Sequence, residues 1–467
     1  MKEIGERFVL MRRVKLESEA PETNISHQLN SQAVLDPEAL RVEAERWRFS
    51  QSLKEVAAFY RKAEGDLIKA CGIADAIWSE SELCDSAINL SAGSLSAETI
   101  HPMRIGYYFI HLKPTGGMRV IVEQVNRLVE AGHDVTVFYR ADEGSPLLPD
   151  WIQCNPSRVV RIPLESRLHE AIAEAPDEVR ELDVIVGTFW TQLWELMQCA
   201  TTEVVYYEQG HENLYEDPNF KGLQPAFELM IRLPVPIMAV SRTVNQALKK
   251  RGREGVLVSP GVSDCFRTGS LRAASATKLE GRPARILLVG SPNLPFKGFD
   301  TVIKALAHLK ERRHNFEVIW ISPTPQPPDL QLPFRCSWVI NPPQDVLAAV
   351  MRCADVFVSG SYYEAFSLPP LEAMASGLAV VAADSGGIRE YARPGENCLL
   401  VPPGSPGSMA AAIEKVLTDP EMRLRLISQG KKTADSHRWP DKIRVLEQVL
   451  WRLVSIKRNE KKTNGDL

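Results

Sequence analysis

The stretch Ser361-Tyr-Tyr-Glu-Ala-Phe-Ser-Leu-Pro-Pro-Leu-Glu-Ala-Met-Ala-Ser-Gly377 contains two glutamates, Glu364 and Glu372, eight residues apart. It follows an apolar run, Asp355-Val-Phe-Val-Ser359, and precedes a second apolar run that starts at Leu378. Prolines suit the first turn of a helix, and glycine suits the residue just past a helix end. The pattern therefore predicts one strand-loop-helix-strand unit.

The N-terminus of this predicted helix is a candidate anion site. Free backbone N–H groups and the helix dipole favour an anion such as a diphosphate, and Phe366, Ser367 and Leu368 would supply the donors. Ser367 is also placed to cap the helix. Glu372, expected in the first turn, is suited to ribose hydroxyls, and Glu364 to hydroxyls of a transferred sugar. Either glutamate alone could simply complement the helix dipole, but the whole segment favours a sugar-nucleotide site.

This segment resembles the retaining glycosyltransferases of family 4. The likeness continues upstream in Arg285-Ile-Leu-Leu-Val-Gly-Ser-Pro-Asn-Leu-Pro-Phe-Lys-Gly-Phe-Asp300 and downstream from Asp384 to Pro403. The resemblance implies an α/β protein of the GT-B type. Two Rossmann-like domains with doubly wound parallel sheets would face each other across a cleft that holds the active site, and a helical extension would precede them.

The resemblance and the apolar patterns together predict five parts of the chain. Residues 1–100 would be the helical extension, because their apolar positions have helical spacing and strand-like alternation is missing. The remaining parts are an acceptor-side domain at 101–267, a linker at 268–284, a nucleotide-sugar domain at 285–436, and a crossing helix with a frayed charged tail at 437–467.

Short apolar runs separated by helical patterns predict a parallel sheet in each domain. The expected strands begin near Arg104, Asp134, Val184, Val204 and Ile237 in the first domain and near Ile286, Phe316, Val356 and Ala379 in the second.

Candidate site residues of the first domain follow from the resemblance. Gly116 and Gly117 match the family's glycine loop, which faces donor diphosphate and acceptor, and Arg119 lies in the first turn of the next helix. His211 would lie near the transferred sugar, either hydrogen-bonding it or steadying positive charge at its anomeric carbon, although a lone histidine is commonly structural. Ser263 stands where the family usually has aspartate, so that loop receives no catalytic role.

The loop from Gly290 to Lys297 is the expected phosphate-binding loop of the second domain. Lys297 matches the family's phosphate-binding lysine, which would stabilise the departing diphosphate. The family usually has an arginine where this chain has Ser291. Arg119 or Arg242 would then have to supply the second cation.

Composition narrows the classes of function. The 467 residues are 44% apolar with a net charge of −4, which gives no general attraction to nucleic acid. Eight cysteines lie singly, without the spacing of metal or redox pairs, so no metal site is expected. No leader and no apolar run of about 18 residues is evident. We expect a cytoplasmic protein, with contact at the inner membrane face left open.

These patterns predict a retaining, metal-independent glycosyltransferase that needs no bound cofactor. Its donor would be a nucleoside-diphosphate sugar and its acceptor a hydroxyl of a glycan, a lipid-linked or another molecule, in polysaccharide, glycolipid or glycoconjugate synthesis. Glu364, Lys297 and His211 are the expected catalytic residues. Two alternatives stay open. A nucleotide-sugar epimerase of related fold would turn over without an acceptor, and a catalytically silent scaffold would bind no nucleotide.

Overall fold

The computed structural model describes residues 100–199, 202–210, 235–267 and 282–465, together with Phe227, Met230, Ile231 and Leu233. The predicted helical extension up to residue 99 and most of the predicted linker lie outside these residues. The elements described below all belong to one compact unit.

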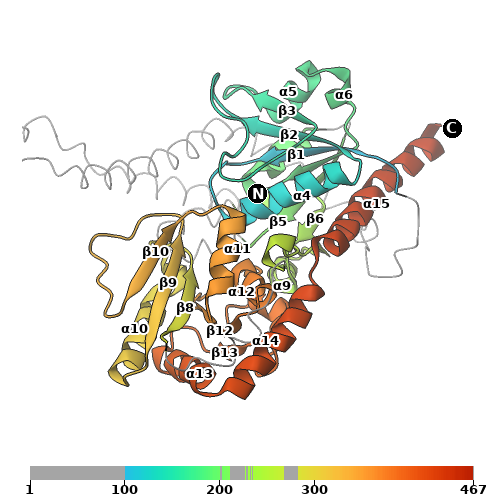
Figure 1. The fold of residues 1–467 in the computed structure, drawn as a ribbon. Helices are drawn as coiled ribbons and strands as arrows, with labels where there is room; N and C mark the ends of the chain where they lie inside the picture. Colours follow the sequence, from blue (N-terminus) through green and yellow to red (C-terminus); the bar gives the residue numbers. More distant parts are fainter. Residues whose placement is uncertain are drawn as a thin grey trace, which may run out of the picture. The chain divides into compact units, whose positions relative to one another are not determined.

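The first domain is built on a seven-stranded sheet in which every pair of neighbouring strands is parallel (Figure 1). Its strand order is β3-β2-β1-β4-β5-β6-β7. The strands are β1 (Arg104–Phe109), β2 (Asp134–Arg140), β3 (Arg158–Ile162), β4 (Val184–Gly187), β5 (Glu203–Glu208), β6 (Ile237–Ala239) and β7 (Val256–Leu257). The five predicted strands are confirmed, and the outer strands β3 and β7 were not predicted.

Helices connect these strands. They are α4 (Gly116–Glu130), α5 (Leu168–Glu174), α6 (Asp177–Arg180), α7 (Leu193–Met197) and α9 (Arg242–Lys249). α4 begins where Thr115, in an extended conformation, accepts a hydrogen bond from the N–H of Met118. Its apolar side, including Ile121, Val125 and Leu128, is buried. This packing fixes the first turn of α4 near the carboxyl end of β1.

The second domain has a six-stranded parallel sheet in the order β10-β9-β8-β11-β12-β13. Its strands are β8 (Ala284–Val289), β9 (Phe316–Ser322), β10 (Cys336–Ile340), β11 (Val356–Ser359), β12 (Ala379–Ala383) and β13 (Leu399–Val401). Its helices are α10 (Phe299–Glu311), α11 (Gln344–Cys353), α12 (Leu368–Ala375), α13 (Pro406–Thr418) and α14 (Pro420–Asp435). The strand order reverses direction between β8 and β11, and ligands of open α/β sheets bind at such a switch point.

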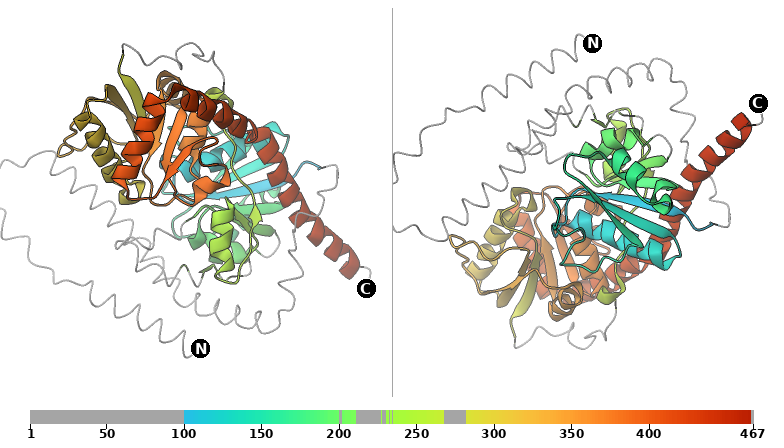
Figure 2. Two further views of the ribbon diagram at one scale, coloured as in Figure 1. Left: turned by 90° about the horizontal axis from the view of Figure 1, so that it is seen from below. Right: turned by 90° about the horizontal axis from the view of Figure 1, so that it is seen from above.

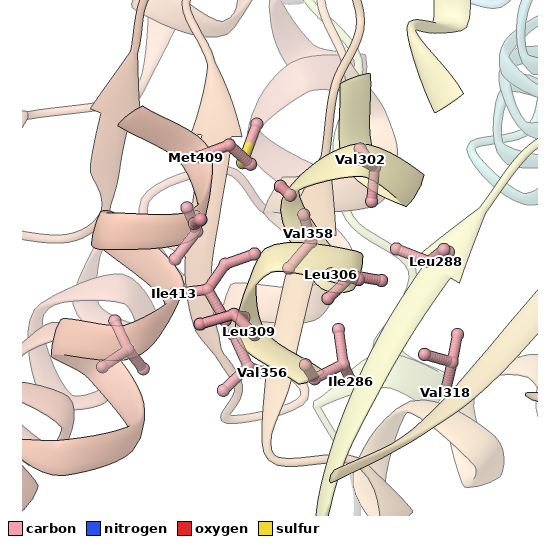
Figure 3. Close-up of a cluster of buried hydrophobic side chains, with 14 of the residues drawn as sticks. Ile286, Leu288, Val302, Leu306, Leu309, Val318, Val356, Val358, Met409 and Ile413 are labelled. Carbon is pink, nitrogen blue, oxygen red and sulfur yellow. The ribbon is translucent and has the colours of Figure 1, made fainter. Parts of the chain in front are cut away.

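The core of the second domain lies between its sheet and helices α10 and α13, and Figure 3 shows part of it. Side chains from β8, β9, β11 and both helices are fully or almost fully buried there: Ile286, Leu288, Val302, Leu306, Leu309, Val318, Val356, Val358, Met409 and Ile413. Burial of each such side chain stabilises the fold by about 1.5–3 kcal/mol. The loops at the switch point are therefore attached to a tightly packed core.

The last helix, α15 (Trp439–Gly465), runs from the end of α14 to the first domain, where it packs against α4, β4 and β5 (Figures 1 and 2). Glu447 of α15 pairs with the buried His133, with 2.9 Å between Oε1 and Nε2. The helix continues to Gly465 and so includes most of the segment that was predicted to be a frayed tail, while the fraying itself stays a prediction. Among the described residues, no helix combines the length and the apolar character that crossing a membrane needs.

Candidate active site

The loops that follow β8 and β11 contact each other through their backbones. Gly298 has φ 61°, and a Cβ placed on it would lie 2.1 Å from the carbonyl oxygen of Gly360. The N–H of Tyr362 also donates to the carbonyl of Phe296 at 2.8 Å. Two glycines are needed here, because only a missing side chain allows this approach and the left-handed conformation of Gly298. The contact brings both loops together at the switch point.

Lys297 and Glu364 form an ion pair across these two loops. The distance from Nζ to Oε1 is 2.7 Å, and the hydroxyl of Ser361 donates to the same carboxylate oxygen at 2.8 Å. The two charged side chains are 22% and 16% exposed, so the pair is only partly screened by water. The structure thus joins two predicted catalytic residues that lie 67 residues apart. Ser361 was missed, although a small polar residue three positions before Glu364 is a signal visible in the sequence.

A third loop holds the backbone of Glu364. Its N–H donates to the carbonyl of Ser385, and its carbonyl accepts from the N–H of Gly387, both at 2.9 Å. A Cβ on Gly387 would lie 2.3 Å from the carbonyl oxygen of Glu364, so the loop after β12 also needs its glycine. Glu364 is therefore positioned by the loops that follow three neighbouring strands.

Helix α12 begins at Leu368, and Ser367 precedes it with φ 68°. The prediction that the Ser367 side chain caps the helix was wrong, because capping requires an extended backbone and this residue is left-handed. The hydroxyl of Tyr391 donates to the carbonyl of Ser367, and the rings of Tyr391 and Phe366 pack 5.6 Å apart. Such strained non-glycine residues persist where their surroundings fix them, often at functional sites. Tyr391 was not singled out from the sequence.

Glu372 is the fifth residue of α12, so the prediction that it lies in the first turn was wrong by one position. Its carboxylate is almost fully buried and pairs with the guanidinium of Arg119 in α4. Burial raises the pKa of Glu372, and the charge of Arg119 opposes that rise. This ion pair links the first domain to the second.

The glycine loop of the first domain lies beside the residue that follows β5. Gly116 and Gly117 begin α4, and a Cβ on Gly117 would lie 3.2 Å from Oε1 of Gln209. The neighbouring Gly210 faces the second domain, since a Cβ there would lie 2.3 Å from the Cβ of Ala365. The next residue, His211, lies outside the described residues, so its predicted role stays a prediction.

Arg242 is the first residue of α9, and its side chain is 67% exposed. Its guanidinium donates to Glu390 at 2.9 Å, and its backbone N–H donates to the same carboxylate at 2.9 Å. The preceding Ser241 donates from its hydroxyl to the carbonyl of Ala365 at 2.5 Å. Arg242 therefore joins the two domains and is already paired with an acid.

Gly290 and Ser291 lie at the start of the loop after β8. Gly290 has φ 137°, and its carbonyl accepts from the indole N–H of Trp320 at 2.9 Å. Ser291 is 6% exposed, and its hydroxyl accepts from the N–H of Asn293 at 3.3 Å. The position where the resembled family has an arginine thus holds a neutral, buried side chain.

Ser263 is buried and bridges the two domains. Its hydroxyl donates to Glu123 of α4 at 2.6 Å and accepts from the amide of Gln344 at 2.9 Å. Glu123 thus brings a carboxylate of the first domain to this position, which the sequence did not indicate. Within the described part of the chain, no group of three or more His, Cys, Asp or Glu side chains is arranged to hold a metal ion.

Two Rossmann-like domains, each with a parallel sheet, define the GT-B fold of glycosyltransferases. Solved structures of that fold are similar to this chain. A sucrose-phosphate synthase from Thermosynechococcus elongatus has a TM-score of 0.62 at 20% identity, over 76% of this chain and 100% of that one. The HepE protein of Anabaena in complex with UDP-glucose has a TM-score of 0.57 at 18% identity, over 78% and 100%. At these identities the likeness concerns the fold.

The sequence comparisons match the second domain to a family model. Residues 275–433 match the family model of the glycosyl transferases group 1. A D-inositol 3-phosphate glycosyltransferase of Streptomyces bingchenggensis is 27% identical, over 72% of this chain and 87% of its own length. Another, from Corynebacterium glutamicum, is 33% identical, over 39% of this chain and 48% of its own length. The second domain is thus similar to the glycosyl transferases group 1, which agrees with the resemblance found in the sequence.

Proposed function

We propose that this protein transfers a sugar from a nucleoside diphosphate to an acceptor hydroxyl, with retained configuration at the anomeric carbon and without a metal ion. The observation that carries the proposal is the pair of Lys297 and Glu364 at the switch point between β8 and β11. Nucleotides bind at such points in doubly wound sheets. In this proposal the pair would provide one cation for the diphosphate and one hydroxyl acceptor for the sugar of the donor.

In the proposed reaction, the bond between the anomeric carbon and the distal phosphate oxygen breaks, and its electrons stay with the diphosphate. The acceptor oxygen bonds to the anomeric carbon from the same face, and its proton passes to a phosphate oxygen. Lys297 and the backbone N–H groups of Phe366, Ser367 and Leu368 would stabilise the growing negative charge. An ammonium has three donors, so Lys297 can bind a phosphate oxygen while it still contacts Glu364.

The carboxylates would hold the donor by its hydroxyls. Glu364, fixed by three loops, would bind the transferred sugar, while Glu372 would accept hydrogen bonds from the ribose. His211 keeps its predicted place near the anomeric carbon, and Gly116 and Gly117 would allow the first domain to approach the diphosphate. In this proposal side chains and helix N-termini neutralise the charge of the departing diphosphate. The reaction would take place in the cytoplasm.

The donor and the acceptor have obvious first candidates. The structure of HepE is a complex with UDP-glucose, and the two relatives from Streptomyces bingchenggensis and Corynebacterium glutamicum are named D-inositol 3-phosphate glycosyltransferases. UDP-sugars and a phosphorylated polyol are therefore the first pair to test, followed by glycan and lipid-linked acceptors.

A thermal-shift screen against UDP, GDP, ADP and their common sugars tests the donor site. A bound nucleotide should raise the melting temperature by mass action, and Glu372→Ala should abolish that rise. Transfer assays with and without EDTA, and NMR of the product's anomeric proton, test metal independence and retention. Turnover of the donor without acceptor would favour an epimerase instead, and binding of none of the nucleotides would favour a silent scaffold.

A further inference from the structure

Arg119 and Glu372 form an ion pair that the proposed donor could not leave intact. Arg119 projects from the first turns of α4 in the first domain, and Glu372 lies in α12 of the second. Their side chains are only 17% and 4% exposed. One oxygen of this carboxylate already binds the guanidinium, and the buried side chain offers little free surface to two ribose hydroxyls. Binding of the ribose therefore requires Arg119 to give up at least part of its contact.

The diphosphate, in turn, needs more positive charge than its own loop supplies. Lys297 is the cation of the loop after β8, and Ser291 of the same loop is buried and neutral. Arg242 is already paired with Glu390 and is mostly exposed to water, which weakens its field. Arg119 stands next to the glycine loop, at the helix N-terminus where an anion is favoured.

We propose that the donor exchanges the partners of this ion pair, so that Arg119 moves from Glu372 to the diphosphate while the ribose takes its place on Glu372. The proposal rests on the proposed function, and it makes Arg119 the second diphosphate-binding cation of this chain. After the exchange Arg119 is paired with the diphosphate and Glu372 accepts hydrogen bonds from the ribose hydroxyls, so neither buried charge is left without a polar partner. Without donor, the same pair holds the two domains together.

A second contact keeps α4 bound to the second domain when Arg119 leaves Glu372. Glu123 lies one turn after Arg119, and it remains tied to Gln344 through the hydroxyl of Ser263. None of these three residues is expected to contact the donor. The helix therefore has one contact that the donor disrupts and a separate one that persists.

The variant Arg119→Gln tests separately whether Arg119 binds the diphosphate and whether the ribose has to displace it from Glu372. UDP, GDP and ADP should each be compared with their own nucleosides by calorimetry on the wild-type protein and the variant. Loss of a charged hydrogen bond should weaken binding of the diphosphate by about 10- to 100-fold. The nucleoside should bind at least as tightly as to wild type, because its ribose no longer has to displace Arg119 from Glu372.

Arg285→Gln is the matched control. It removes an arginine whose ion pair, with Glu317 at 3.0 Å, lies within the second domain alone, and it should change neither affinity. Equal weakening of nucleoside and diphosphate in Arg119→Gln would show a merely structural residue and overturn the exchange. An unchanged affinity of Arg119→Gln for the diphosphate would overturn the exchange as well.

Two further observations keep the test decisive. If Arg119→Gln gives no folded protein by circular dichroism, Arg119→Lys replaces it. That variant should weaken diphosphate binding several-fold and spare the nucleoside, because a lysine keeps the charge but loses the bidentate geometry. If the wild-type protein binds no nucleotide, the proposed function itself has failed. The exchange alone fails when the wild-type protein binds a diphosphate but the Arg119 variant does not combine weaker diphosphate binding with unweakened nucleoside binding.

Discussion

Replacement of Gly298 by alanine should damage the candidate site through the backbone alone. Gly298 links the 3₁₀ turn Pro295–Lys297 to α10 and has φ 61°. The new Cβ would lie 2.1 Å from the carbonyl oxygen of Gly360, a distance that real Cβ contacts essentially never show. The loops after β8 and β11 would have to separate, and the contact between Lys297 and Glu364 would lengthen.

Two terms contribute to the loss of stability. Alanine in the left-handed region costs about 1–2 kcal/mol relative to glycine. The overlap with a backbone atom adds about 1–3 kcal/mol, as is typical of overpacked sites. We expect Gly298→Ala to lower the free energy of unfolding of the second domain by about 3 kcal/mol. For a domain of this size that corresponds to a fall in melting temperature of about 6–12 °C.

Gly395→Ala supplies the matched control. Gly395 has φ 77° in the same domain, but a Cβ there meets nothing within 4 Å, so only the conformational cost of about 1 kcal/mol remains. Melting temperatures from calorimetry and nucleotide affinities from titration should be measured for both variants. Gly298→Ala should be clearly less stable and bind the nucleotide more weakly. Equal stability of the two variants would refute the argument that the loops are in close contact.

Three further changes have defined outcomes. Lys297→Ala should lower kcat by about 10²- to 10³-fold, the effect of losing one group that stabilises transition-state charge, as measured by product formation. Leu306→Ala should cost about 2–5 kcal/mol in urea unfolding, because Leu306 is fully buried, whereas the exposed Leu424→Ala should cost about 0.5 kcal/mol or less. Burial raises the pKa of the Cys398 thiol to about 12, so the thiolate stays scarce from pH 8 to pH 10. Iodoacetamide should spare it and modify the exposed Cys353.

Each of these expectations has a result that contradicts it. Full activity of Lys297→Ala would remove the lysine from the proposed reaction, and Lys297→Arg, which keeps the charge, should retain part of the rate. Similar unfolding energies for both leucine variants would contradict the burial of Leu306. Alkylation of Cys398 in the folded protein at pH 8, seen by mass spectrometry, would show that its thiol is accessible and ionised.

Most of the fold could be predicted from the sequence because its central strands are continuous apolar runs. β8 and β11 are each flanked by two neighbours, and such strands need apolar residues on both faces. The edge strands β3 and β10 escaped prediction because they are only partly buried and mix polar with apolar residues. An apolar pattern in the sequence reveals a strand only where its side chains are buried, and the side chains of an edge strand are less buried.

The candidate site divides in the same way. By itself, the sequence determined the strand-loop-helix unit around Glu364 and Glu372 and the loop that carries Lys297, because proline, glycine and apolar spacing act on neighbouring residues. Only the tertiary structure decided that Lys297 pairs with Glu364 and that Arg119 pairs with Glu372, 253 residues away. No local pattern encodes such a pair, since the approach of two charges depends on how separate sheets and helices pack.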